Sequence, residues 1–435
     1  MNLIMERADI GLAIRATQRA KRGRDQGMRC PISSFGKDFD PLDLSDPFPL
    51  LACARREQPV FYSPAIDYWV VTSYDDVKAI FQDHDTYTAA NTISPIVPFS
   101  EAVKRLLAEG DYSPEPVLSN NVPPSHSRIR ALVNRLFTPR RMKSFAPAIH
   151  RIAERSIERL RERAPVDIVA ELTFEYPAYV LFHVLGVPDT DVPRVKAWAG
   201  NRIKLYYGRP SAEEQIEMTR RLIPFWHYVV DLVRGKLERP ADDLTSDLIR
   251  MRNGDDSVLT INEIASCMIT LLVAGHETTT AQINNALLHC LSQRELWQRL
   301  CEQPEAIPQF LEEMMRYDPS ICTWRRLAAR DSVISGVEIP AGANLLLMLN
   351  SANRDEKTFR EPDAIIPARE NLKDHLAFGY GIHYCVGAPL ARLEMAILLE
   401  ALTRELPDLR LLPDQKIEYT RNISFRGPVA LHVTW

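Results

Sequence analysis

Apolar residues recur every three to four positions along most of this 435-residue chain, which is the spacing of a helix with one buried face. The pattern is clearest in four stretches and predicts helices over residues 149–163, 213–238, 261–291 and 307–317. The third stretch is apolar on nearly every face. It therefore predicts a long helix that is buried on most sides.

Strand-like stretches are shorter and lie toward the two ends of the chain. Apolar and aromatic residues suggest strands over residues 59–62 and 68–72, and short strands are expected again over 332–350 and 409–435. The predicted fold class is mainly α, with small β-sheets at the two ends of the chain.

Composition narrows the class of protein. Hydrophobic residues make up 46% of the chain and charged residues 25%, as in ordinary globular proteins, and the net charge of -4 argues against a general nucleic-acid binder. The seven cysteines are odd in number and form no Cys-x-x-Cys pair, which favours a reducing, cytoplasmic location over a disulfide framework or a zinc site. The longest apolar run, residues 264–275, is too short to span a bilayer, and the basic first 27 residues lack the apolar core of a signal or anchor.

The segment over residues 378–394 carries the strongest chemical signal. Gly379 and Gly381 allow a tight loop, and Pro389 suits the first turn of a helix that follows it. Cys385 lies directly before that helix, where free N–H groups and the helix dipole favour the thiolate. A thiolate held in this way is a nucleophile or a metal ligand, whereas a lone cysteine is more often an inert core residue.

A second motif places polar groups inside the long apolar helix. Ala274 and Gly275 remove bulk in mid-helix, and space for a ligand would compensate for the cost of glycine there. Glu277 and Thr278 add a carboxylate and a hydroxyl, and an unpaired carboxylate in an apolar setting is costly. The structural alternative is that Thr278 hydrogen-bonds a carbonyl of its own helix and that Glu277 points to solvent.

Together these motifs resemble those of the cytochrome P450 family. The loop has the form Phe-x-x-Gly-x-His-x-Cys-x-Gly, and Leu-Ala-Arg-x-Glu follows it at residues 390–394. The resemblance implies a single haem domain over residues 38–435, preceded by an N-terminal extension, residues 1–37. It also implies that Cys385 is the axial ligand of the iron of haem b, with the haem between the long central helix and the helix after the loop.

The resemblance assigns roles on both sides of the haem. On one side, Thr278 would hydrogen-bond dioxygen and Glu277 would feed a proton relay. Further residues that would contact the haem are Ala274, Gly275, Phe378, Gly379 and Gly387. Donors for the two haem propionates would be His126, Arg130, Arg326 and His383. Glu313, Arg316 and Arg369 match the family's structural ion triad and have no catalytic role.

The activity implied is that of a haem-thiolate monooxygenase, which inserts one atom of O2 into an organic substrate with electrons from NAD(P)H. The segments that match substrate-facing positions are mainly apolar and aromatic, so a small or medium-sized apolar substrate, aromatic ones included, would be hydroxylated or O-dealkylated. The predicted pocket residues are Ile93, Leu271, Ile321, Trp324 and Ile423. The sequence does not identify the substrate.

Electrons would enter on the side of the cysteine. Residues 125–143 carry six Arg and Lys side chains and no acidic residue, which suits an acidic ferredoxin or flavodoxin. Other segments, such as 324–327 and 424–428, look like haem domains of reductase-fused bacterial enzymes. No flavin or iron–sulfur segment is present in this sequence, so either separate redox partners or an isolated haem domain is expected, as a monomer. Two rivals stay open, a peroxide-using haem-thiolate enzyme and a non-catalytic haem sensor, and the Glu277–Thr278 pair counts against both.

Overall fold

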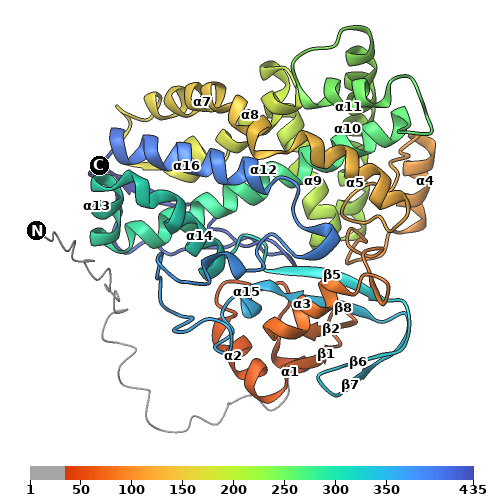
Figure 1. Ribbon diagram of the computed structural model, residues 1–435, viewed down its shortest axis with the longest axis horizontal. Helices are drawn as coiled ribbons and strands as arrows, with labels where there is room; N and C mark the ends of the chain where they lie inside the picture. The colour runs from red at the N-terminus through yellow and green to blue at the C-terminus, as the bar shows by residue number, and fades with distance from the viewer. Residues whose placement is uncertain (1–34) are drawn as a thin grey trace, which may run out of the picture.

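A helical part and a sheet-containing part adjoin each other in the computed structural model, which describes residues 35–435 (Figure 1). The helices are α1 (Phe35–Asp38), α2 (Phe48–Glu57), α3 (Tyr74–Gln82), α4 (Glu101–Glu109), α5 (Ser125–Leu136), α6 (Pro139–Ser144), α7 (Ala146–Glu158), α8 (Tyr176–Leu185), α9 (Val192–Tyr207), α10 (Ala212–Glu238), α11 (Leu244–Arg252), α12 (Ile261–Leu291), α13 (Arg294–Glu302), α14 (Ile307–Tyr317), α15 (Leu349–Ala352) and α16 (Ala388–Glu405). The mainly helical class predicted from the sequence is confirmed. Both α12 and α14 have the predicted bounds, whereas α7 starts three residues earlier and ends five residues earlier than predicted.

The strands combine differently from the prediction. They are β1 (Val60–Ser63), β2 (Tyr68–Val71), β3 (Tyr87–Thr88), β4 (Val166–Asp167), β5 (Thr323–Ala328), β6 (Ser332–Ile334), β7 (Val337–Ile339), β8 (Asn344–Met348), β9 (Arg410–Leu411) and β10 (His432–Thr434). One five-stranded sheet has the order β1-β2-β8-β5-β3, so the early strands pair with strands nearly 300 residues later. Only β2 and β8 run parallel, with Val70 opposite Leu346. The prediction of separate sheets at the two chain ends is therefore wrong for this sheet.

Helix α12 is the axis of the helical part. At its start, Thr260 and Glu263 form a capping box, which satisfies free N–H groups of the first turn. The 31 residues give a helix of about 46 Å. Figure 1 shows α16 beside it and α8, α9 and α10 around it. Within residues 35–435, no helix combines the length and apolarity that crossing a bilayer requires.

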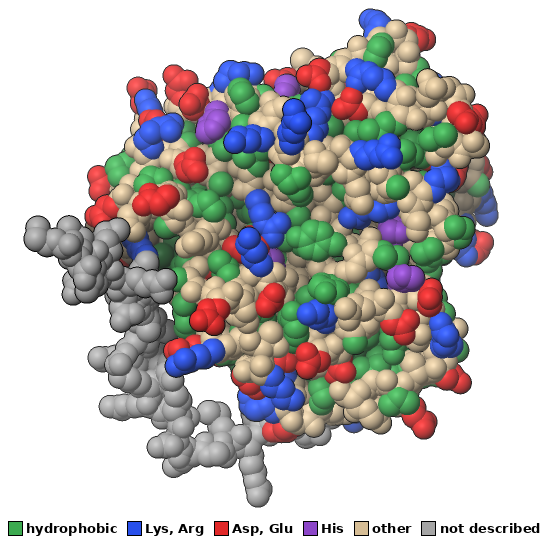
Figure 2. Space-filling view, viewed as in Figure 1, with side chains coloured by type: hydrophobic (Ala, Val, Ile, Leu, Met, Phe, Trp, Pro, Cys, Tyr) green, Lys and Arg blue, Asp and Glu red, His purple; other side chains and the backbone are tan. Residues whose placement is uncertain are grey.

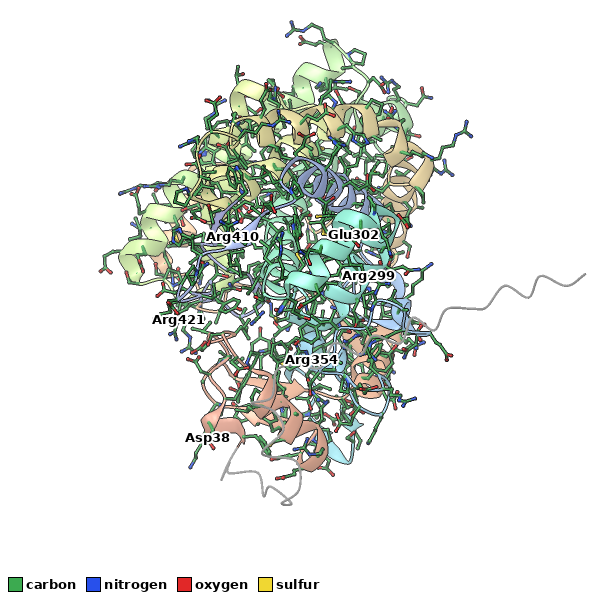
Figure 3. All side chains as sticks on the ribbon, turned by 90° about the vertical axis from the view of Figure 1, so that its left-hand side faces the viewer. Asp38, Arg299, Glu302, Arg354, Arg410 and Arg421 are labelled. Carbon is green, nitrogen blue, oxygen red and sulfur yellow. The ribbon has the colours of Figure 1, made fainter. Side chains whose placement is uncertain are left out.

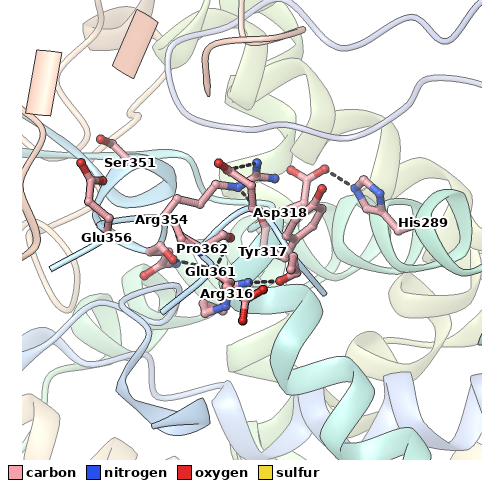
Figure 4. A network of polar contacts seen from close by, with 12 residues as sticks. His289, Arg316, Tyr317, Asp318, Ser351, Arg354, Glu356, Glu361 and Pro362 are labelled. Carbon is pink, nitrogen blue, oxygen red and sulfur yellow. Dashed lines mark hydrogen bonds and ion pairs between the residues drawn. The ribbon is translucent and has the colours of Figure 1, made fainter. Parts of the chain in front are cut away.

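The junction between the two parts is polar and buried. Asp318, just after α14, accepts a hydrogen bond from His289 Nε2 at 2.7 Å and contacts the guanidinium of Arg426 (Figure 4). Arg426 Nε in turn donates to the carbonyl of Leu44 at 2.6 Å. Burial alone would raise the pKa of Asp318, but Arg426 and His289 outweigh burial and hold that pKa well below its usual range.

Arg354 closes the same junction from the sheet side (Figure 3). Its guanidinium lies 3.6 Å from the centre of the Phe48 ring and 3.9 Å from that of Tyr317, and its Nε donates to the Tyr317 carbonyl at 2.8 Å. These contacts tie α2 and α14 to the segment after α15.

The predicted N-terminal extension, residues 1–37, lies outside the described residues except for 35–37. Phe35 opens α1, and its ring centre lies 5.8 Å from that of Phe61 on β1. The packed part of the chain therefore includes residues at least three positions before the predicted boundary at residue 38.

Candidate active site

A cavity of about 240 Å³ opens between the middle of α12 and the loop that precedes α16. Its wall carries residues from both predicted motifs: Ala274, Gly275 and Thr278 on α12, and Phe378, Gly379, His383, Cys385 and Gly387 on the loop. The sequence predicted that these two segments lie on opposite sides of one ligand, and the structure brings them to one cavity.

The loop owes its shape to two glycines. Gly379 and Gly381 both have φ of +70°, which side-chain-bearing residues rarely adopt. A Cβ on Gly381 would lie 2.7 Å from the carbonyl oxygen of Phe81, so the loop also needs glycine there to pack against α3. The backbone N–H of Cys385 donates to the Phe378 carbonyl at 2.8 Å, which fixes the cysteine at the end of the loop.

The Cys385 side chain is exposed and borders the cavity. Although Cys385 faces the cavity, the surrounding protein desolvates its thiol and raises the pKa. The N–H groups of Gly387 and Ala388 lower that pKa by less. The N–H groups therefore act in the predicted direction but do not by themselves make Cys385 a thiolate. A coordinated metal ion would, because metal coordination deprotonates a thiol.

On the opposite wall, the α12 motif is an unbroken helix. Thr278 Oγ1 donates to the Ala274 carbonyl at 2.9 Å, as in the structural alternative, yet the side chain still borders the cavity. A Cβ on Gly275 would lie 2.9 Å from a methyl carbon of Leu181. Glycine at position 275 therefore lets α8 approach α12, in addition to any room it leaves for a ligand.

Glu277 lies away from the cavity wall, in contact with Lys196 of α9. Lys196 Nζ donates to its Oε1 at 3.1 Å, and His276 Nε2 lies 3.2 Å from the same oxygen. Burial raises the pKa of Glu277, but His276 and Lys196 outweigh it and bring the pKa to about 2. In this geometry Glu277 is a paired carboxylate. It neither points to solvent nor reaches the cavity.

This pairing predicts a pH-dependent stability. Glu277→Gln should lower the free energy of unfolding at pH 7 by about 3 kcal/mol, because the pKa falls from its ordinary value of 4.5 to about 2 on folding and the side chain is only 24% exposed. A lowered pKa stabilises the fold above pH 4.5, and this contribution is lost as pH falls toward 2. Urea unfolding should show that about 2 kcal/mol of the difference has gone by pH 3.

The control for this measurement is the exposed Glu162, whose replacement by Gln should leave stability unchanged at either pH. A wild-type advantage over Glu277→Gln that stays constant from pH 7 to pH 3 would show that the carboxylate charge is not what stabilises this contact.

Four basic side chains gather at one edge of the cavity without an acidic partner among the described residues. The His126 and His383 ring centres are 4.2 Å apart, and neither ring nitrogen of His126 has a hydrogen-bond partner. Arg326 is 1% exposed and uses only Nη1, on the Arg325 carbonyl, while Nη2 has no partner. Arg130 contacts the Tyr384 carbonyl and Asn134.

Burial and mutual repulsion destabilise the charged forms in this cluster. Burial comes first in each case and lowers the pKa of His126 to about 4, that of His383 to about 2 and that of Arg326 to about 9. Buried donors are normally paired, so this group is arranged for an anion. Two carboxylates of a single ligand fit that requirement.

Sequence reasoning missed three polar residues near this cavity. Lys196 and Arg202 lie on the apolar stripe of α9 that contains Val192, Val195 and Ala199, and a cation on such a stripe was the available signal. Glu394 of α16 borders the cavity, and burial raises the pKa of its carboxyl well above the usual range, so it is a neutral acid near Thr279.

Known proteins resemble this chain along most of its length. The family model described as Cytochrome P450 matches residues 60–418. Nocardicin C N-oxygenase of Nocardia uniformis subsp. tsuyamanensis is 34% identical over 403 residues, which cover 91% of this chain and 97% of that protein. The chain belongs to the cytochrome P450 family.

Solved P450 structures superpose closely on this one. A cytochrome P450 named CREJ, in complex with (4-ethylphenyl) dihydrogen phosphate, matches with a TM-score of 0.89 and 37% identity, over 92% of this chain and all of that one. An intact type IV self-sufficient P450 monooxygenase matches with the same TM-score and identity, over 93% of this chain and 54% of that chain. The predicted likeness to haem domains of reductase-fused P450s is thus confirmed, and the chain is a P450 monooxygenase.

The residues present fit a haem. The unpartnered donors of His126, His383 and Arg326 match two propionates, and Cys385 is the one thiol that the described residues place on the cavity wall. Arg326 and His126 lie behind His383 rather than on the wall itself, whereas Arg130 is part of the wall.

Replacement of Arg326 should weaken haem binding without lowering the stability of the haem-free chain. Arg326→Leu should weaken haem binding by about 10- to 100-fold, the value of a charge-assisted hydrogen bond in a buried site. It should not destabilise the haem-free chain, because it removes a buried charge that has no acidic partner among the described residues. Haem transfer to a scavenger and urea unfolding of the haem-free chain measure the two effects. Arg330→Leu, an exposed site four residues on, should change neither.

Four of the five predicted substrate residues border the cavity: Ile93, Leu271, Ile321 and Trp324. Ile423 does not. Its side chain is fully buried in a hydrophobic cluster with Tyr207 and Met348, and its N–H donates to the Tyr207 carbonyl at 3.0 Å. Phe425, two residues later, borders the cavity instead.

Proposed function

We propose that this P450 binds haem b through Cys385 and hydroxylates or O-dealkylates a small or medium-sized, largely apolar substrate, with electrons from NAD(P)H through a ferredoxin or flavodoxin. The observation that carries the proposal is the placement of one thiol on the wall of a cavity whose opposite wall is the Ala274–Thr278 turn. The unpartnered cations at its edge support a ligand with two carboxylates.

Haem, when bound, supplies the redox chemistry that activates dioxygen. The chain would contribute Cys385 as the thiolate ligand, which would donate electron density to a bound haem. Thr278 Oγ1 holds a proton at the cavity wall, and its bond to the Ala274 carbonyl orients it. Glu277 can deliver protons only if its carboxylate leaves Lys196, so we infer that exchange of this ion pair with water accompanies each delivery.

The cavity wall favours an aromatic substrate. Trp324, Phe425, Tyr206, Tyr207 and Phe81 all border it. Aromatic rings pack against one another edge to face or offset, and such pairs add to the gain from burying apolar area. The CREJ structure holds an aryl compound, (4-ethylphenyl) dihydrogen phosphate, and that P450 is 37% identical to this chain, which supports the same substrate class here.

The electron-donor surface is smaller than the sequence suggested. Arg128 pairs with Glu263, and Arg141 pairs with Asp242 and Asp247, so these two cations are neutralised within the fold. The exposed cations left without an ion pair to any described residue are Arg135, Arg140 and Lys143. Figure 2 shows basic and acidic side chains interspersed on the face that carries α5 and α16.

These three cations predict how a donor would bind. Arg135→Glu should slow electron transfer from an acidic ferredoxin by about 10-fold at low salt and flatten its dependence on ionic strength, because charged surfaces steer association. Stopped-flow reduction of the ferric haem measures the rate. Arg410→Glu on β9 (Figure 3) is the matched charge reversal and should have little effect. Equal effects of both reversals would remove this surface from the proposal.

Isotope labelling tests the proposed function. The haem-loaded protein is supplied with a panel of alkylbenzenes and aryl ethers, NAD(P)H and a ferredoxin system under labelled O2. The expected product carries one labelled oxygen atom. Turnover with hydrogen peroxide but none with NAD(P)H would contradict the proposal and favour the peroxide-using rival.

A further inference from the structure

A charged side chain of α9 borders the cavity without an acidic partner among residues 35–435. Arg202, on α9, is 8% exposed, and its Nε has no hydrogen-bond partner. It forms no ion pair with any described residue. Burying an unpaired guanidinium costs several kcal/mol, so this position should be compensated by a ligand or by its neighbours.

The neighbours do not supply an anion. The groups that act on Arg202 are three phenols, Tyr112, Tyr206 and Tyr207, which together raise its pKa against the effect of burial, and Tyr112 is also a hydrogen-bonding neighbour. Glu115 borders the adjoining side pocket, but its carboxylate accepts a hydrogen bond from Asn262 Nδ2 at 2.6 Å and lies on the side of Arg128. The Glu115 carboxylate is thus engaged elsewhere.

Ring stacking holds Arg202 in place without supplying a counter-ion. Its guanidinium carbon lies 5.2 Å from the centre of the Tyr206 ring. A guanidinium over a ring uses its face, which leaves the N–H groups at its edge free to bind a planar or tetrahedral anion. A second buried arginine, Arg325, lies over the neighbouring Tyr207 ring at 4.7 Å and also lacks an ion pair among the described residues. Both arginines make this corner electropositive.

Arg202 of α9 and Thr270 of α12 border the same two cavities, so α12 relates Arg202 to the reaction centre. A side pocket of about 230 Å³ shares Ile93, Arg202, Tyr206 and Thr270 with the main cavity, so there is room for a head group at this end. Thr270 lies one helical turn before Ala274 and two turns before Thr278, which corresponds to about 6 and 12 Å along the axis. A substrate that binds at Arg202 and extends along the wall past Ala274 would bring its apolar body to Thr278.

We propose that Arg202 binds the carboxylate or phosphate of an otherwise apolar substrate, and that this anchor selects which carbon reaches the haem. The inference rests on the proposed function, which it deepens by naming the substrate class. It also revises the expectation of an uncharged substrate, because the apolar wall binds the body of the molecule while Arg202 binds its charged end.

Matched pairs of ligands test the proposal on the haem-loaded full chain. The probes are 4-propylbenzoate and 4-propylphenyl phosphate, with the neutral counterparts 4-propylbenzamide and 4-propylphenol. Dissociation constants come from the optical spin-state shift of the ferric haem and, independently of the haem, from titration calorimetry. The variants are Arg202→Met and Arg202→Lys, and the control is Lys204→Met, an exposed cation on the same helix.

Wild type should bind at least one anion 10-fold or more tightly than its neutral counterpart. Arg202→Met should weaken that anion by about 10- to 100-fold, as expected for a charge-assisted hydrogen bond, and the neutral compound by less than 3-fold. Arg202→Lys should retain part of the preference, and Lys204→Met should retain all of it. The compound that shows the preference tells a carboxylate site from a phosphate site.

Equal loss for anions and neutral compounds in Arg202→Met would show a structural role and overturn the proposal, as would equal affinities in wild type. The proposed function fails by a different observation, namely a reduced wild-type protein whose carbon monoxide complex lacks the spectrum of thiolate ligation. In that case calorimetry of wild type and Arg202→Met still tests whether Arg202 binds anions.

Discussion

Glu313→Gln is expected to lower the free energy of unfolding by about 3–5 kcal/mol, the cost of removing one partner from a buried ion pair. Glu313 and Arg316 are both fully buried, and the guanidinium donates to both carboxylate oxygens, at 2.8 and 2.7 Å. Arg369 Nε also donates to Glu313 Oε1, at 3.0 Å, as does the N–H of Ile366, at 2.8 Å. Glutamine would leave two buried arginines without an anion.

Urea unfolding of the haem-loaded protein measures this effect. Glu302→Gln on α13 is the control, because Glu302 is exposed (Figure 3). A change in stability below about 1 kcal/mol for Glu313→Gln would show that the three charges do not act as a buried network.

Cys385→Ser is expected to reduce monooxygenase turnover by on the order of 1000-fold or more, or about 4 kcal/mol in activation free energy, because a serine oxygen does not replace the electron donation of a thiolate. The fold should survive, since the side chain is exposed to the cavity and the loop is held by backbone contacts. Product formation per bound haem is the measurement. Circular dichroism and haem content show whether the fold and the site are intact.

Cys301→Ser, which changes a half-buried cysteine of α13, is the matched control and should retain full turnover. Turnover of Cys385→Ser within 10-fold of wild type would remove Cys385 from its role as axial ligand.

Local signals made the helices and the loop predictable. Helix α12 has the predicted bounds because consecutive residues determine its apolar periodicity, its length and its capping box at Thr260. The loop around Cys385 was predictable for the same reason, since two glycines and a proline specify it within a few positions.

Long-range pairing was not predictable in this way. Strand β5 lies between β8 and β3 in its sheet, but it was read only as a source of haem and substrate contacts, because a six-residue strand gains its stability from these neighbours. Ile423 shows that the side chains facing the cavity could not be predicted even within one short segment. Ile423 and Phe425 lie two positions apart, and only the isolated pairing of Phe425 with Ile321 places Phe425 at the cavity.

Ion pairs between residues far apart in the sequence were also not predicted. The motif predicted Glu277 as a proton carrier, but its partner Lys196 lies 81 residues earlier on α9. Arg128 looked like part of a docking patch, whereas Glu263 at the start of α12 neutralises it. The predicted place of Arg369 in the ion triad agrees with its contact to Glu313 in the structure.

The central claim is that Cys385 ligates a haem iron as a thiolate. The most direct test is the absorption spectrum of the reduced, haem-loaded wild-type protein under carbon monoxide. The account predicts the strongly red-shifted Soret band of a thiolate-ligated complex. A Soret band at the position of a histidine-ligated or thiol-ligated complex, in freshly purified and folded protein, would contradict it.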